Sequence, residues 1–127
     1  MKDINGTVPV ATKILIVDDE TDICYFLKRN FSRRGFNASI SGTLAEAEKQ
    51  IETSTPNLLL LDNHLPDGKG VDFAGKISVK YPGIIIIMLT AHDSPQDRAK
   101  AYDNGITFFL SKPFTMERIN QAVDLML

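Results

Sequence analysis

The sequence predicts an α/β fold in which a parallel sheet of five strands is covered by helices on both faces. Short apolar runs recur along the chain, and amphipathic segments with the 3.6-residue period of a helix separate them. Glycine, proline or a capping residue marks most of the boundaries. Strands and helices that alternate in this way build a parallel sheet through right-handed crossovers, which place helices on both faces.

The central strand is the run Leu58-Leu59-Leu60-Leu61, which ends at Asp62. So short an apolar run after Pro56 is too short for an ordinary helix and is typical of a strand buried on both faces. A carboxylate at the carboxyl end of such a strand lies at the edge where open α/β sheets bind their ligands. Asp62 is therefore the first candidate for a reactive group, and residues 63–70 are predicted to form a loop over it.

The first half of the chain also contains two strands and two helices. The first strand runs abruptly into Asp18-Asp19-Glu20, and the first helix ends at Gly35, as a left-handed cap would. Thr43 and Glu46 have the spacing of a capping box at the start of the second helix. The expected ranges are 13–17, 21–35, 36–40 and 43–52.

The second half repeats the alternation. Tyr81-Pro82-Gly83 stops the third helix, and the strand Ile84–Leu89 leads into Thr90. Ser94 as cap and Pro95 at the first helical position begin the fourth helix. The expected ranges are 70–80, 84–89, 94–105, 107–110 and 115–127.

Length and composition suit one domain. A chain of 127 residues can bury a single core, and we divide it into a polar leader at 1–12 and a domain at 13–127. The net charge of −2 provides no field that would attract nucleic acid or anionic lipid. No apolar run is long enough for a signal peptide or a membrane span, and Cys24 is the only cysteine, so we expect a cytoplasmic protein.

Polar residues end the predicted strands, and a parallel sheet brings those ends to one edge. They are Asp18 and Asp19, Asp62, Thr90 and, shortly after the last strand, Lys112. Two carboxylates ~5 Å apart repel by roughly 3 kcal/mol at an effective dielectric constant of ~20, so cations must compensate. Lys112 supplies one positive charge, and Mg²⁺, which prefers oxygen ligands, is the natural second.

Each of these residues also has a structural explanation. Asp18 alone is more often a turn former or a helix cap, Thr90 an ordinary strand end, and Lys112 a solvated loop lysine. The joint pattern is more specific, because a fold predicted without these residues still places all of them on one edge.

In this arrangement the sequence resembles the receiver domain of bacterial two-component response regulators, from about Lys13 to Leu127. The motifs that carry the resemblance are Ile16-Val17-Asp18-Asp19-Glu20, the leucine strand with Asp62 and Pro66, Thr90-Ala91, and Phe109-Leu110-Ser111-Lys112-Pro113-Phe114. The resemblance implies a flavodoxin-like three-layer sandwich with strand order 2-1-3-4-5.

The resemblance also implies roles for the site residues. Asp62 is expected to accept a phosphoryl group from a sensor histidine kinase or a phosphotransfer protein, as an acyl phosphate. Asp18, Asp19, Asp62 and the backbone carbonyl of His64 are expected to hold Mg²⁺. Such a protein is a signalling phosphoacceptor rather than an enzyme, since it catalyses at most its own phosphoryl transfer and autodephosphorylation.

The same resemblance implies a switch. Thr90 and Lys112 are expected to bind the phosphoryl group, and Phe109 to turn toward the space that Thr90 leaves. The face of the fourth helix, the fifth strand and the fifth helix is then the expected surface for an output protein or domain. Phe109 lacks a hydroxyl, so its inward position must depend on packing, and an ordinary core or surface phenylalanine is the alternative.

His64 and His92 each lie two residues after a predicted site residue, Asp62 and Thr90. We hypothesise that the pair tunes the lifetime of the acyl phosphate, by blocking water or by hydrogen-bonding it; solvated histidines without kinetic effect are the alternative. A transition-metal site is disfavoured, because no third ligand is evident. Lys69 stands where the family usually has an acid, which predicts a changed loop conformation.

Three other functions are alternatives for this pattern. A pseudo-receiver, which binds proteins without phosphorylation, is the main alternative, but none of the expected site residues is missing. An aspartyl-phosphate hydrolase usually carries a cap after its first strand, and residues 19–23 leave no space for one. A dinucleotide-binding enzyme would need a glycine-rich turn where Asp18-Asp19-Glu20 lies.

Overall fold

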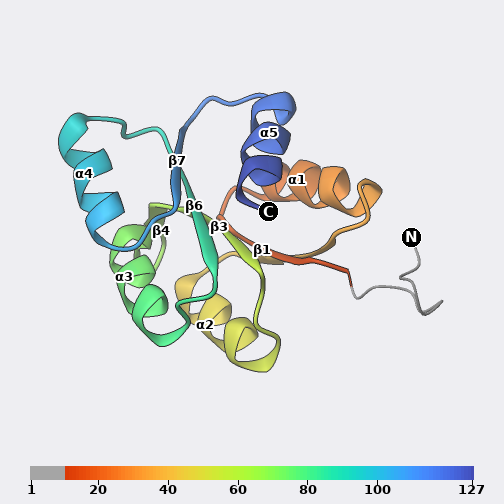
Figure 1. Cartoon of the computed structure of the whole chain (residues 1–127), viewed down its shortest axis with the longest axis horizontal. Helices are drawn as coiled ribbons and strands as arrows, with labels where there is room; N and C mark the ends of the chain where they lie inside the picture. Colours follow the sequence, from red (N-terminus) through yellow and green to blue (C-terminus); the bar gives the residue numbers. More distant parts are fainter. Residues whose placement is uncertain (1–10) are drawn as a thin grey trace.

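The computed structural model describes residues 11–127, and within this range the alternating pattern is complete (Figure 1). The strands are β1 (Lys13–Val17), β2 (Asn37–Ser41), β3 (Leu58–Asp62), β4 (His64–Leu65), β5 (Gly68–Lys69), β6 (Ile85–Thr90) and β7 (Phe108–Ser111). The helices are α1 (Thr21–Arg33), α2 (Leu44–Thr53), α3 (Gly70–Lys80), α4 (Pro95–Asp103) and α5 (Met116–Met126). Residues 1–10 of the predicted leader lie outside the described residues, so the division into leader and domain stays a prediction.

The main sheet of residues 11–127 has the order β2-β1-β3-β6-β7, and all of its neighbours are parallel. This is the predicted 2-1-3-4-5 order, since β6 and β7 are the fourth and fifth strands of the sheet. In the register, Val17 lies opposite Leu61 and Asp62 opposite Leu89. The predicted fold class is therefore confirmed.

Helices cover both faces of the sheet, and the core is divided accordingly. α1 and α5 lie on one side, while α2, α3 and α4 lie on the other (Figure 1). Because side chains alternate along a strand, Leu58 and Leu60 pack on the α1 and α5 side, whereas Leu59 and Leu61 pack on the opposite side. This two-sided burial explains why β3 is apolar without alternation.

The helix ends follow the predicted signals with one difference. Gly35 has a φ of +90°, as expected for the left-handed residue that ends α1. Ser94 and Asp97 form a complete capping box at α4. At α2 the Thr43 hydroxyl accepts from the Glu46 backbone N–H at 3.1 Å, but the Glu46 carboxylate accepts from Gly42 instead, so this box is only half formed.

Residues 63–70 differ from the prediction, because they contain a hairpin rather than only a loop. His64 pairs with Lys69 and Leu65 with Gly68 in an antiparallel ladder. Gly70 ends the segment, where a Cβ atom would lie 2.1 Å from the backbone oxygen of Asp62. Only glycine fits so close to the end of β3. Three strands, β2, β6 and β7, also begin and end one residue later than predicted.

Candidate functional site

The ends of β1 and β3 bring three aspartates together. Because Val17 and Leu61 are opposite each other in the parallel register, Asp18 and Asp62 follow them at the same edge. Asp18, Asp19 and Asp62 each offer a carboxylate oxygen, and these oxygens all lie within 4.8 Å of one another. Asp18 and Asp62 are buried, whereas Asp19 is exposed.

Lys112 reaches into this acidic cluster from the segment after β7. Its Nζ lies 2.9 Å from an Asp18 carboxylate oxygen, 3.1 Å from Glu20 and 3.7 Å from Asp62. The Lys112 backbone N–H donates to the carbonyl oxygen of Thr90 at 2.8 Å, which fixes the segment to the end of β6. Sequence reasoning missed Glu20 as a partner of Lys112, although its place beside Asp19 in the acidic run was a signal.

Burial and charge oppose each other at this site. Burial raises the pKa of Asp62, as does the charge of Asp18, while Lys112 and the Asn63 backbone N–H at 2.9 Å lower it less. Burial lowers the pKa of Lys112, but its hydrogen bond to Asp18 and the surrounding carboxylates outweigh burial and raise it. Lys112 is therefore charged at neutral pH, and the ionised form of Asp62 is less favourable in the folded chain than in water.

Thr90 and Phe109 lie on neighbouring strands. Thr90 is buried at the end of β6, and its hydroxyl accepts from the backbone N–H of His92 at 3.1 Å. Phe109 is buried in the core cluster on the α3 and α4 side of the sheet, and the Arg98 guanidinium lies 5.0 Å from its ring centre. Arg98 is paired with Asp93. Sequence reasoning missed this cation–π contact, because Arg98 and Phe109 are far apart in the chain.

His64 and His92 lie against each other in the segments that follow β3 and β6. Their ring centres are 4.3 Å apart with an interplanar angle of 36°, and both residues are exposed. His64 belongs to the β4–β5 hairpin, and His92 follows β6. The structure therefore brings together two side chains that the sequence placed only in separate loops.

The donor set of the cluster suits Mg²⁺. Three carboxylates supply hard oxygen ligands, and the buried negative charge that Lys112 only partly offsets favours a divalent cation. His64 follows Asp62 by two residues, at the start of the β4–β5 hairpin.

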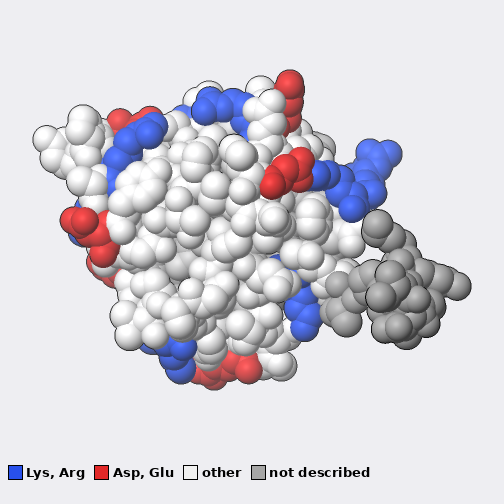
Figure 2. All heavy atoms as spheres, in the orientation of Figure 1, with Lys and Arg blue, Asp and Glu red and all other residues white. Residues whose placement is uncertain are grey.

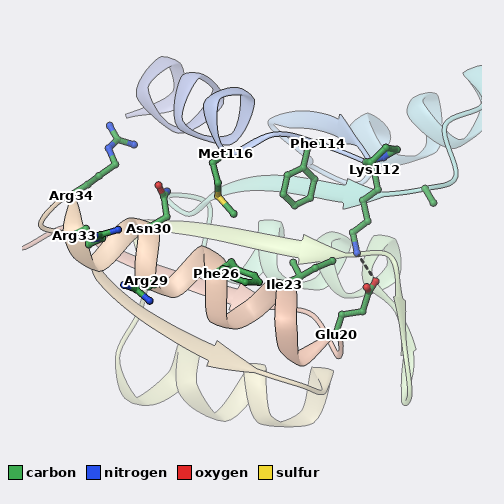
Figure 3. A pocket seen from close by; sticks show the side chains of 12 residues that line it. Glu20, Ile23, Phe26, Arg29, Asn30, Arg33, Arg34, Lys112, Phe114 and Met116 are labelled. Carbon is green, nitrogen blue, oxygen red and sulfur yellow. Dashed lines mark hydrogen bonds and ion pairs between the residues drawn. The ribbon is translucent and has the colours of Figure 1, made fainter.

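A groove of about 890 Å³ adjoins the cluster (Figure 3). Ile23 and Phe26 of α1 form one wall, and Phe114 and Met116 face them from the segment after Lys112. The Phe26 side chain is 58% exposed. Three basic residues line the same groove: Arg29 and Arg33 of α1, and Arg34 directly after it.

Figure 2 shows how charge is distributed on one face of the molecule. Charged side chains of both signs lie mainly along the outline, and the centre of this face carries few charged residues.

Comparison with known proteins decides the family. The family model of the response regulator receiver domain matches residues 14–124. The chain belongs to this family. The receiver domain is 33% identical over 115 residues to the alkaline phosphatase synthesis transcriptional regulatory protein PhoP of Bacillus subtilis, covering 91% of this chain and 48% of that protein. It is 34% identical over 121 residues to the transcriptional regulatory protein DpiA of Escherichia coli, covering 92% of this chain and 52% of that protein.

A solved two-component response regulator from Clostridium difficile has the same fold, with a TM-score of 0.87, 28% identity, and coverage of 91% of this chain and 94% of that chain. The receiver domain spans about half the length of the curated relatives it matches. Receiver domains are the signalling phosphoacceptors of two-component systems, and the family generally binds Mg²⁺ at an acidic pocket. None of the helices within residues 11–127 combines the length and the apolar composition that a membrane span requires.

Proposed function

We propose that Asp62 is the phosphoacceptor of a cytoplasmic phosphorelay and receives its phosphoryl group from a histidine kinase or a phosphotransfer protein. One observation carries the proposal: Asp62, Asp18 and Asp19 share one edge of the sheet with the Lys112 ammonium group. A carboxylate nucleophile, acids for a metal ion and a cation for the product are thereby within reach of one another.

The chemistry follows from these side chains. A carboxylate oxygen of Asp62 attacks the phosphorus of phosphohistidine, the new O–P bond forms as the N–P bond breaks, and the imidazole leaves. Asp18, Asp19, Asp62 and the His64 carbonyl would hold Mg²⁺, which supplies positive charge to the transferring oxygens when bound. Lys112 then moves from Asp18 to pair with the phosphoryl group, and the Thr90 hydroxyl donates to another of its oxygens.

The output surface is the face formed by α4, β7 and α5. Movement of Thr90 and Lys112 toward the phosphoryl group displaces the ends of β6 and β7 together. The reason is that the backbone N–H of Lys112, after β7, donates to the backbone carbonyl of Thr90, at the end of β6. Phe109 lies between this edge and α4, so its packing transmits the change to the partner.

Incubation with a small phosphodonor and Mg²⁺ tests the proposal by intact mass. The native chain is expected to gain one phosphoryl group, and neither Asp62→Asn nor the native chain with a chelator is expected to gain one. A native chain that stays unmodified would favour the pseudo-receiver, whose fold binds proteins without phosphorylation.

The groove lined by α1 is the proposed docking surface for the phosphodonor protein. It is continuous with the site, since Glu20 and Lys112 line its end, and Lys112 also pairs with Asp18 and Asp62 of the acidic cluster (Figure 3). Its apolar walls and its arginine rim suit an amphipathic helix with acidic flanks. A donor seated there brings its phosphohistidine to the open side of Asp62.

Phe26→Ala is expected to slow transfer from a phosphotransfer protein by about five- to thirtyfold, since the loss of an aromatic anchor of an interface commonly costs about 1–2 kcal/mol. Phosphorylation by a small donor is expected to stay unchanged. Val79→Ala, at an exposed apolar residue of α3, provides the matched control for both reactions. Equal transfer rates for Phe26→Ala and the native chain would show that the phosphodonor protein does not dock in the groove.

The histidine pair is proposed to shield the acyl phosphate from water. Its two rings lie 4.3 Å apart on the rim of the site, one from each of the two segments that border it. His64→Ala and His92→Ala are each expected to speed the decay of the phosphorylated chain several-fold, because water then reaches the acyl phosphate more easily. The decay of phosphorylated protein after donor removal measures this rate. Unchanged lifetimes in both variants would show that the two histidines are solvated side chains with no effect on the decay.

A further inference from the structure

The tip of the β4–β5 hairpin is hydrogen-bonded to the first turn of α2 through the side chain of Asp67. One carboxylate oxygen of Asp67 accepts from the backbone N–H of Leu44 at 2.9 Å, and the other accepts from that of Ala45 at 3.0 Å. The next N–H of the first turn, that of Glu46, donates to the Thr43 hydroxyl at 3.1 Å. The first turn of α2 is thus capped by two side chains, one from its own segment and one from the hairpin.

The other end of the hairpin is fixed by Asn63. Its backbone carbonyl accepts from Gly70 at 2.8 Å, and its side-chain oxygen accepts from the Val71 N–H at the start of α3 at 2.9 Å. A ladder of two residue pairs is too short to hold its own geometry in water. The position of the hairpin therefore depends on its attachments, which include the hydrogen bonds of Asn63 at the base and of Asp67 at the tip and the packing of Leu65 against the core.

His64 lies between these two attachments, and its carbonyl is one of the ligands proposed above. We infer that Asp67 is a positioning residue for the Mg²⁺ site, because it clamps the hairpin to α2 and so holds the His64 carbonyl beside Asp62. This inference rests on the proposed function.

The chemistry of the clamp agrees with this role. The Leu44 and Ala45 N–H groups lower the pKa of Asp67, so the carboxylate is charged at neutral pH. A negative charge at the N-terminus of a helix is also favoured by the helix dipole. Asp67→Asn keeps one accepting oxygen and loses the charge, whereas Asp67→Ala removes both bonds.

A simple helix cap would explain the same two hydrogen bonds, so the test needs a control that weakens α2 without touching the hairpin. Thr43→Val is that control, because it removes the other cap of the same turn. Calorimetric titration with Mg²⁺ of the native chain and the variants Asp67→Ala, Asp67→Asn and Thr43→Val measures the affinity, and thermal unfolding without metal measures the stability.

Asp67→Ala is expected to weaken Mg²⁺ binding roughly tenfold, the lower end of the effect of residues that orient metal ligands. Asp67→Asn is expected to lie between Asp67→Ala and the native chain, and Thr43→Val to bind as the native chain does despite a lower melting temperature. Native affinity in both Asp67 variants, with Mg²⁺ binding intact in the native chain, would make Asp67 a helix cap alone. If the native chain itself bound no Mg²⁺, the proposed metal site would be overturned and the clamp's role with it.

Discussion

Replacing Lys112 by alanine is expected to destabilise the metal-free protein by about 3 kcal/mol, the usual loss when one partner of a buried ion pair is removed. The Lys112 side chain is 13% exposed and that of Asp18 only 1%. In the native chain, Lys112 Nζ lies 2.9 Å from a carboxylate oxygen of Asp18 and 3.7 Å from one of Asp62. The substitution removes this positive charge and leaves the two carboxylates facing each other. Urea denaturation in the presence of a chelator measures the loss.

Lys76→Ala is the matched control, because Lys76 pairs with Glu48 on the exposed surface. Its loss is expected to stay below about 1 kcal/mol, as for other exposed ion pairs. Saturating Mg²⁺ is expected to recover part of the stability of Lys112→Ala and to leave the ranking of the two variants unchanged. Equal losses in the two lysine variants would show that Lys112 does not neutralise the acidic cluster.

Asp62→Asn, unlike Lys112→Ala, is expected to stabilise the metal-free protein. The expected gain is roughly 1 kcal/mol, as is common when an unfavourable charge is removed. Burial and the charge of Asp18 raise the folded-state pKa of Asp62. A carboxyl group whose pKa is raised by folding lowers stability once the pH exceeds its unfolded pKa, so the penalty is present at neutral pH and disappears in acid. The gain in melting temperature should therefore shrink as the pH falls toward 3.

The same substitution is expected to abolish most of the stabilisation by Mg²⁺. Mg²⁺ at a free concentration of about 100 times its Kd is expected to raise the free energy of unfolding of the native chain by about 2.7 kcal/mol, as any ligand that binds only the folded state would. Asp103→Asn, at an exposed residue at the end of α4, is the control and should change stability by less than about 0.5 kcal/mol. A metal-free Asp62→Asn chain that is less stable than the native chain would contradict the electrostatic account of the site.

The fold could be predicted from the sequence because apolar runs and helical periods specify the elements, and parallel crossovers leave few topologies. That topology also predicts that the residues after Val17 and Leu61 lie at one edge, which is where the structure places Asp18 and Asp62. The β4–β5 hairpin was not predicted, because Pro66 and Gly68 indicate a turn but do not indicate that the residues on either side of the turn pair as strands. The Arg98 contact with Phe109 and the Asp67 contact with α2 depend on the directions of side chains from distant segments, which no local pattern contains.

The most direct test is to locate the phosphoryl group in the phosphorylated chain. Borohydride reduction converts an aspartyl phosphate to homoserine, and peptide mass mapping then identifies the residue that carried it. We expect homoserine at position 62 alone, formed only when the phosphodonor and Mg²⁺ are both supplied. Homoserine at Asp18 or Asp19 with Asp62 unmodified would contradict the assignment of Asp62 as the phosphoacceptor.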